Sequence, residues 1–210
     1  MTESDLREAL VRWGKSMFGR GLTAGSSGNM SVRLEDGYLF TPTNSCLGFL
    51  DPDRLSKLDP AGKPVSGDPP TKELPLHFAF YESRPAAAAV VHLHSTYATA
   101  LSCLADTDPE DALPPMTPYV VMRVGRLPSV PYTRPGSADV APLIRATAPS
   151  PAVLLGNHGP VVSGKSLDGA VFAIEELEEA ARLAVITRGL NVRYLGRAEI
   201  GDLEATFKTR

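Results

Sequence analysis

Cysteine is scarce in this chain, which contains only Cys46 and Cys103 among its 210 residues. Neither cysteine belongs to a Cys-x-x-Cys pair, so the sequence does not indicate a disulfide scaffold. We expect both to be small, buried apolar side chains of a protein from a reducing compartment.

Long apolar runs and an excess of basic residues are also missing. The longest apolar stretch is far too short to cross a bilayer, and the N-terminal stretch MTESDLREAL is polar and acidic, unlike a signal peptide. Lysine and arginine together number 21 against 24 acidic residues, a formal net charge of −3, which implies no basic face for nucleic acid. These features predict a cytoplasmic protein without membrane or nucleic-acid partners.

The rest of the composition is that of an ordinary globular protein. Hydrophobic residues make up 43% of the chain and charged residues 21%, and a chain of this length can bury a sizeable core. The sequence contains no repeat and no clear domain boundary. We therefore expect a single domain over residues 1–210.

Helical and strand patterns are mixed along the chain. Helical spacing of apolar residues predicts helices over residues 2–18, over 71–83 and from Ser166 onward, while the Asp36-Gly37 pair predicts a hairpin. Strands are expected at AAAAVVHLH, on both sides of the turn in PAVLLGNHGPVVSG, and at PYVVMRV; the polar tail from residue 191 is expected to cover another element or a neighbouring chain. The mixture predicts a three-layer α/β or α+β fold with a partly antiparallel sheet.

The stretch AVVHLHSTYATALSCL, residues 89–104, contains two of the chain's four histidines. His92 and His94 are two positions apart at the end of an apolar strand, so both side chains project from the same face. Two imidazoles on one face can grip a metal ion together. The alternative is two ordinary strand residues, which the concentration of histidine at this point disfavours.

His158 and Glu73 are candidates to complete such a site. Alone, His158 in the glycine-flanked turn of VLLGNHGPVV is more typical of a solvent-facing residue, but with a His-x-His pair it completes three histidines and an open position, a catalytic zinc pattern. Glu73, in the first turn of its helix, either interacts with the helix dipole or serves as general acid/base and displaceable fourth ligand. His77, four residues later on the same helix face, could be a ligand or hydrogen-bond to one, but we expect it to pack, because apolar neighbours such as Leu76 and Phe80 also need burial there.

The motifs GLTAGSSGNMSVR, YLFTPTNSCLG, TKE, AVVHLHSTYATA and LLGNHGPVV resemble, in order and spacing, those of the class II aldolase/adducin family, up to about residue 190. The resemblance implies a three-layer α/β/α sandwich with a mixed, partly antiparallel central sheet, assembled as a homotetramer. It also implies one zinc ion (Zn2+) per chain on His92, His94 and His158, with Glu73 as acid/base and fourth ligand. Residues that bind the substrate phosphate in the family match Gly28, Asn29, Thr43, Asn44, Thr71 and Lys72.

The residues themselves agree with an anion site. The loop SSGNMS offers backbone N–H groups, hydroxyls and an amide, although alone it is equally a turn before a strand. Thr71 and Lys72 lie at an expected helix N-terminus, where anions bind favourably.

Two departures from the family pattern narrow the expected activity. Sugar-phosphate aldolases and epimerases of the family carry glycine at the position of Asn44 and two serines at those of Thr71 and Lys72. The pattern here is similar to that of the 3-oxo-tetronate 4-phosphate decarboxylase subgroup, which implies zinc-dependent conversion of that small phosphorylated sugar acid to dihydroxyacetone phosphate and CO2 through a metal-stabilised enediolate. A lysine beside Glu73 suits a substrate that carries a carboxylate as well as a phosphate.

Three other functions remain open at this point. One is a class II aldolase that cleaves a ketose 1-phosphate, as L-fuculose-phosphate aldolases do, and another is a pentulose-phosphate 4-epimerase. The third is a non-catalytic, adducin-like interaction domain without metal ligands, which the presence of three histidines and Glu73 disfavours.

Overall fold

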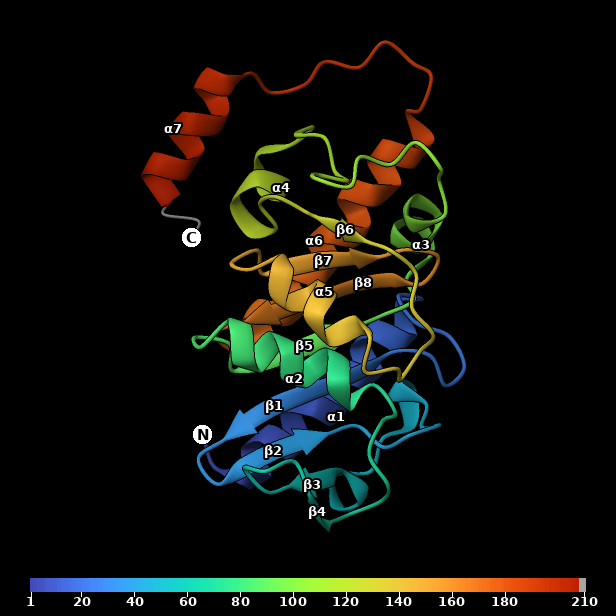
Figure 1. Ribbon diagram of the computed structural model, residues 1–210, viewed down its shortest axis with the longest axis vertical. Coiled ribbons are helices and arrows are strands. Elements are labelled where there is room, and N and C mark those ends of the chain that lie inside the picture. Colours follow the sequence, from blue (N-terminus) through green and yellow to red (C-terminus); the bar gives the residue numbers. More distant parts are fainter. Residues whose placement is uncertain (208–210) are drawn as a thin grey trace.

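The computed structural model describes residues 1–207, and its central feature is one eight-stranded sheet (Figure 1). The strands are β1 (Asn29–Leu34), β2 (Gly37–Phe40), β3 (Ser56–Leu58), β4 (Pro64–Ser66), β5 (Ala89–His92), β6 (Ser129–Val130), β7 (Ala152–Leu155) and β8 (Gly159–Gly164). They lie in the order β4-β3-β2-β1-β5-β8-β7-β6. Each neighbouring pair is antiparallel except β6 and β7, which confirms the mixed, partly antiparallel sheet.

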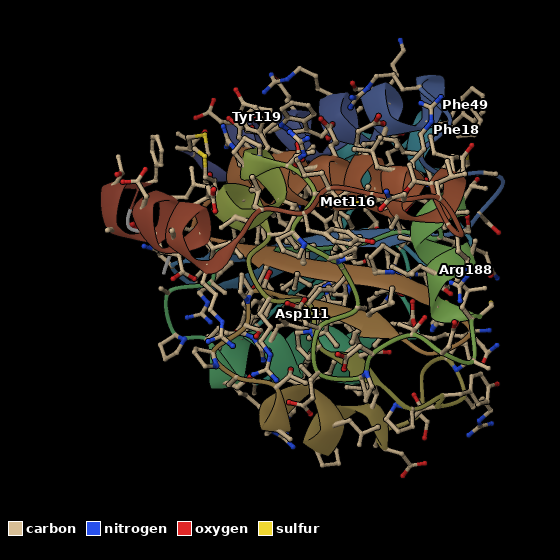
Figure 2. All side chains as sticks on the ribbon, turned by 90° about the horizontal axis from the view of Figure 1, so that it is seen from above. Phe18, Phe49, Asp111, Met116, Tyr119 and Arg188 are labelled. Carbon is tan, nitrogen blue, oxygen red and sulfur yellow. The ribbon has the colours of Figure 1, made fainter. Side chains whose placement is uncertain are left out.

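Helices cover both faces of this sheet. One face packs against α1 (Glu3–Gly19), α3 (Thr96–Ser102), α4 (Pro118–Arg123) and α6 (Leu167–Ile186). The other packs against α2 (Leu74–Ser83) and α5 (Val140–Ala146), and Figure 2 shows the resulting three layers. The predicted α/β/α sandwich is therefore confirmed. No helix within residues 1–207 has the length and apolar character needed to span a bilayer.

Strand β5 shows how the alternation of side chains positions the site. Ala89, Val91 and Leu93 belong to the apolar cluster under α1, α3 and α6, whereas Val90 belongs to the cluster under α2 and α5. His92 has the parity of Val90, so it faces the α2 side of the sheet. The fully buried strand thus delivers an imidazole beside the N-terminus of α2.

The segment PYVVMRV, expected to be a strand, is instead the helix α4, so that prediction is wrong. The hydroxyl of Thr117 accepts the N–H of Val120, and Pro118 occupies the first turn. This cap and the preset backbone of proline outweigh the strand preference of the two valines. The strand of this part of the chain is β6, which is parallel to β7.

Helix α2 begins later than expected. The predicted start was Thr71, but the first helical residue is Leu74, and Glu73 is the N-cap without a side-chain capping bond. The hydroxyl of Thr71 accepts the N–H of Glu73 at 3.3 Å. Glu73 therefore lies just before the first helical residue, and its carboxylate lies near the end of β5.

The C-terminal tail contains the helix α7 (Arg197–Phe207), which has no fully buried residue. Leu195, Ile200 and Leu203 pack at the margin of the core, and the Leu195 N–H donates to the carbonyl of Pro115. The tail therefore packs near α4, which agrees with the expectation that it covers another element.

The expectation of buried cysteines is wrong. Cys103 is exposed and Cys46 is partly exposed. Cys103 is the residue that ends α3 at the surface, and Cys46 precedes the short 3-10 helix Leu47–Phe49. Neither position faces the interior that the apolar character of cysteine favours.

Candidate active site

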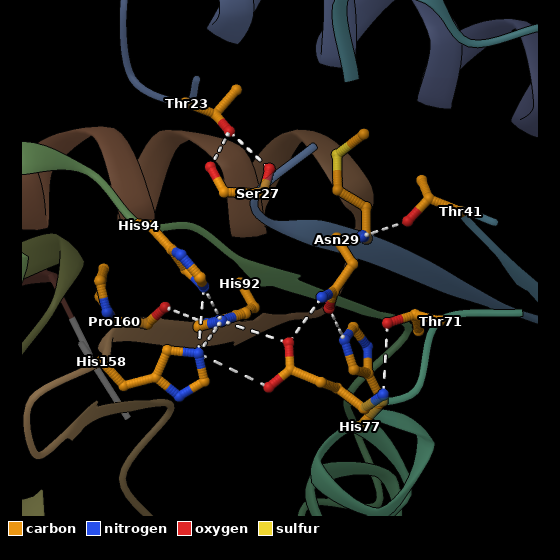
Figure 3. A network of polar contacts seen from close by, with 12 residues as sticks. Thr23, Ser27, Asn29, Thr41, Thr71, His77, His92, His94, His158 and Pro160 are labelled. Carbon is orange, nitrogen blue, oxygen red and sulfur yellow. Dashed lines mark hydrogen bonds and ion pairs between the residues drawn. The ribbon is translucent and has the colours of Figure 1, made fainter. Parts of the chain in front are cut away.

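Four of the predicted site residues converge beside the end of β5 (Figure 3). His92 is the last residue of that strand, and His94 follows two positions later. His158 comes from the turn between β7 and β8, and Glu73 from the N-cap of α2. One ligand atom from each of the four lies within 4.8 Å of the others, so residues far apart in the sequence form one cluster.

The three imidazoles present their Nε2 atoms to one another. The His92 and His94 nitrogens are 3.1 Å apart, those of His94 and His158 3.0 Å, and those of His92 and His158 3.3 Å. Two nitrogens bound to one zinc ion at a tetrahedral angle lie about 3.3 Å apart. The Nδ1–H of His92 donates to the carbonyl of Pro160 at 2.9 Å, which leaves a lone pair on Nε2. The donor set therefore fits a divalent metal ion.

The protonation states of the three histidines also fit metal binding. Burial lowers the pKa of His92 and of His94, and lowers the pKa of His158 to about 4. Neutral imidazole is the form that binds a metal, so these histidines are ready to act as ligands near neutral pH.

Glu73 faces this cluster as a carboxylate. Its oxygens lie 3.4 Å from His92 Nε2 and 3.7 Å from His158 Nε2. Burial opposes ionisation, but His92 and a hydrogen bond from Asn29 outweigh it and hold the pKa of Glu73 below its ordinary value. Glu73 is thus an ionised carboxylate next to the imidazoles, and its role as acid/base stays a prediction.

On the side away from the imidazoles, Asn29 contacts the carboxylate of Glu73 and His77 contacts Asn29. Asn29 is the register partner of His92 across β1 and β5, and its Nδ2–H donates to Glu73 Oε2 at 2.7 Å. The Oδ1 of Asn29 lies 2.6 Å from Nε2 of His77. His77 is fully buried, as expected for a packing residue, but it is also hydrogen-bonded to the site.

Gly28 precedes β1 and Asn29 is its first residue, and both lie beside His92. Gly28 has a φ of +79°, and a Cβ at this position would lie 2.9 Å from the carbonyl oxygen of His92. Only glycine fits this backbone conformation and close approach without strain. Its role toward a substrate phosphate stays a prediction.

The other expected phosphate residues lie on two adjacent segments. The N–H of Thr43 donates to the Pro69 carbonyl at 2.9 Å, and that of Thr71 to the Thr41 carbonyl at 3.2 Å, so the loop after β2 runs beside the approach to α2. Thr43 and Asn44 line a surface cavity. Other residues of its lining are Ser45, Cys46, Phe49, Arg54 and Asp68. Anion binding by these residues stays a prediction.

Lys72 differs from its neighbours because it is exposed. Its backbone packs against the loop between β6 and α5, where a Cβ on Gly136 would lie 3.0 Å from the Lys72 carbonyl oxygen. The charged end of Lys72 is therefore free to approach a ligand from the surface.

The sequence did not indicate that the loop between β6 and α5 takes part in the site. Arg134 and Thr133 of this loop line a small cleft together with Glu73, Leu76 and His158. The surrounding segment is rich in proline and has no regular periodicity, so only the tertiary fold places it here. Arg134 is an exposed basic residue of this lining.

The comparisons with known proteins agree with this architecture. Residues 8–185 match the family model described as class II aldolase and adducin N-terminal domain. A 3-oxo-tetronate 4-phosphate decarboxylase of Escherichia coli strain K12 is 51% identical over 205 residues, covering 97% of each chain. The L-fuculose phosphate aldolase of Haemophilus influenzae is 31% identical, covering 100% of this chain and 96% of its own.

The solved structures show the same relationship. The Escherichia coli protein YgbL, described as a candidate aldolase, epimerase or decarboxylase, superimposes with a TM-score of 0.93 at 49% identity, covering 96% of this chain and 98% of its own. An L-fuculose 1-phosphate aldolase superimposes with a TM-score of 0.88 at 28% identity, covering 99% and 98%. The chain belongs to the class II aldolase and adducin family.

Proposed function

We propose that this protein is a metal-dependent carbon–carbon lyase that converts 3-oxo-tetronate 4-phosphate to dihydroxyacetone phosphate and CO2. The observation that carries the proposal is the group of three Nε2 atoms next to the carboxylate of Glu73. The name and the near full-length coverage of the relative that is 51% identical support the choice of substrate.

The chemistry divides between the imidazoles and Glu73. His92, His94 and His158 would hold a divalent cation, which would supply Lewis-acid stabilisation for the negative charge that develops as CO2 leaves. The carbon that loses the carboxylate must then gain a proton. Because Glu73 is ionised at rest, it must first take up a proton from water and then pass it to this carbon, and its carboxylate lies against the imidazoles, where that transfer is possible. Asn29 holds the Glu73 side chain in this position.

Recognition of a substrate with two negative groups requires cations and N–H donors near the site. The N–H groups of Thr43 and Thr71 are already engaged, so the donors proposed for the phosphate are the hydroxyls of these two threonines and N–H groups of the loop that contains Gly28. Arg134 at the cleft and Lys72 at its edge supply the charge for the carboxylate before it is lost. A neutral aldehyde fragment has no use for these two cations.

An aldolase that cleaves a ketose 1-phosphate is the second candidate. The chain is 31% identical to an L-fuculose phosphate aldolase over its full length, and the same donor set supports cleavage to an aldehyde. The two reactions differ in the leaving fragment, so the cations around the site and not the imidazoles separate them.

Comparison of two substrates tests the proposal. The purified protein, loaded with zinc, is assayed with 3-oxo-tetronate 4-phosphate and with L-fuculose 1-phosphate under the same conditions. We expect kcat/KM for the acid to exceed that for the ketose phosphate by at least about a hundredfold, the discrimination that a site with paired polar groups can reach. A preference for the ketose phosphate would favour the aldolase.

We further propose that the resident metal is zinc, one ion per chain, and that the protein is a cytoplasmic homotetramer with residues 1–210 as one domain. Zinc suits three imidazoles with an open fourth position. Elemental analysis of the purified protein and sedimentation in solution test the metal and the assembly.

A further inference from the structure

Behind Glu73, a row of buried polar groups runs from the site into the layer between the sheet and α2. Asn29 Oδ1 lies 2.6 Å from His77 Nε2, and His77 Nδ1 lies 2.7 Å from the hydroxyl of Ser31. The Ser31 hydroxyl lies 2.8 Å from the hydroxyl of Tyr81. Each of these four residues is at most 6% exposed, so bulk water cannot replace a missing partner.

The carboxylate of Glu73 determines the direction of every hydrogen bond in this row. A carboxylate only accepts, so Asn29 must turn its NH2 group toward Glu73 and its carbonyl oxygen toward His77. That oxygen also only accepts, so the proton of His77 must be on Nε2. Nδ1 of His77 is then an acceptor for the Ser31 hydroxyl, which in turn accepts from Tyr81.

The other tautomer of His77 would create an unfavourable contact between Asn29 and Glu73. If His77 carried its proton on Nδ1, its Nε2 would require a donor, and the Asn29 amide would turn over to supply it. The carbonyl oxygen of Asn29 would then face the Glu73 carboxylate, with two acceptors in contact in a buried site. The tautomer of His77 and the orientation of the Asn29 amide are therefore coupled.

We propose that His77 is a positioning residue for the reaction: as the Nε2–H tautomer, supported by Ser31 and Tyr81, it holds the Asn29 amide with its NH2 group on Glu73. Burial lowers the pKa of His77 to about 3, which agrees with a permanently neutral ring. His77 does not touch a metal ion or substrate, and it acts on Glu73 only through Asn29. The catalytic part of this proposal depends on the proposed function of Glu73, whereas the tautomer does not.

The first test is a direct determination of the tautomer. In the metal-free protein labelled with ¹⁵N at histidine, the nitrogen shifts of His77 distinguish a protonated nitrogen from an acceptor nitrogen. We expect the proton on Nε2 and an acceptor at Nδ1. A proton on Nδ1 would overturn the proposal, whether or not the protein turns over the proposed substrate.

The second test compares variants of His77. In His77→Gln the amide can still donate to Asn29, whereas His77→Leu removes the donor. We expect kcat with 3-oxo-tetronate 4-phosphate to fall about 10–100-fold in the leucine variant, with a smaller change in KM and unchanged metal content, and to recover most of that loss in the glutamine variant. Equal losses in both would mean that the donor is irrelevant.

A matched pair of buried serines separates positioning from stability. The Ser31 hydroxyl on β1 belongs to the row, whereas the Ser163 hydroxyl on β8 donates to the Pro151 carbonyl at 3.1 Å, outside it. Both serines are at most 6% exposed. We expect Ser31→Ala to lower kcat and weaken the Nε2–H preference of His77, and Ser163→Ala to leave both unchanged. Equal effects of the two on kcat, at equal loss of stability, would overturn the positioning role.

Discussion

Asn29 and His92 are partners across the antiparallel pair of β1 and β5, and this register brings the Asn29 amide, the His92 imidazole and Glu73 together. A slip by one residue would send Asn29 to the opposite face of the sheet. The active site is therefore a consequence of strand pairing at the centre of the sheet as much as of the residues themselves.

Metal binding and turnover respond differently to substitutions in the cluster. We expect His158→Ala to lose most of the bound zinc and all turnover, because two imidazoles leave an incomplete ligand set. We expect Glu73→Gln to retain the zinc and to lower kcat about 10²–10⁴-fold, the usual contribution of a general acid/base. Elemental analysis and steady-state kinetics on both variants check this, and retention of zinc in His158→Ala would contradict the ligand assignment.

Lys72 is expected to matter more for a substrate that carries a carboxylate than for one that does not. Because Lys72 is exposed and lies beside the loop that contains Arg134, Lys72→Ser should remove one cation without disturbing the core. We expect kcat/KM for the acid to fall about tenfold or more, and aldol condensation with neutral aldehydes to change far less. Kinetics with both kinds of substrate test this. Equal loss for both would leave Lys72 without a role in carboxylate recognition.

Glu178 of α6 is expected to stabilise the segment that follows His94. Its two carboxylate oxygens accept the N–H groups of Tyr97 and Ala98 at 2.8 Å, and so cap α3 from another helix. The local cap residue, Ser95, makes no capping bond. We expect Glu178→Ala to lower the free energy of unfolding by about 2 kcal/mol and to weaken metal binding.

The neighbouring Glu179 is the control for this change. It is exposed on the same helix and its contact is with Arg182, so Glu179→Ala should alter the free energy of unfolding by less than about 0.5 kcal/mol. Urea denaturation with zinc titration measures both quantities. Similar behaviour of the two alanine variants would contradict the capping role of Glu178.

Stability at high pH is expected to depend on Tyr81. Burial raises the pKa of its hydroxyl above the ordinary value of 10.0. Above that pH the unfolded chain releases a proton that the folded chain retains, so the free energy of unfolding falls by about 1.4 kcal/mol per pH unit for this group. Tyr81→Phe should be less stable near neutral pH but lose stability less steeply above pH ~10. Parallel pH profiles of the two proteins would refute this.

Local patterns in the sequence predicted the three imidazoles that the structure brings together, and their role as metal ligands stays a prediction. The alternation in AVVHLH places His92 and His94 on one face, and the turn between two apolar runs isolates His158. Long-range pairing brings the rest of the site together. Nothing in the sequence indicated that Asn29 lies opposite His92, or that Arg134 reaches the cleft, since both depend on how distant segments pack.

The wrong prediction of a strand at PYVVMRV has a local origin. Two consecutive valines favoured a strand at PYVVMRV, but a capping threonine and a proline begin the helix α4 there. Packing is the expectation for His77 because its neighbours on the helix need burial, and its four-residue spacing from Glu73 says nothing about Ser31 and Asn29 on β1. Side chains that act through partners in other elements cannot be identified from local periodicity.

The most direct test of the central claim is conversion of 3-oxo-tetronate 4-phosphate by the zinc-loaded protein in D2O, followed by NMR. We predict CO2 and dihydroxyacetone phosphate with one deuterium on the carbon that lost the carboxylate, and loss of this product in Glu73→Gln. No release of CO2, together with condensation of dihydroxyacetone phosphate with a small aldehyde, would contradict the decarboxylase and make the protein an aldolase.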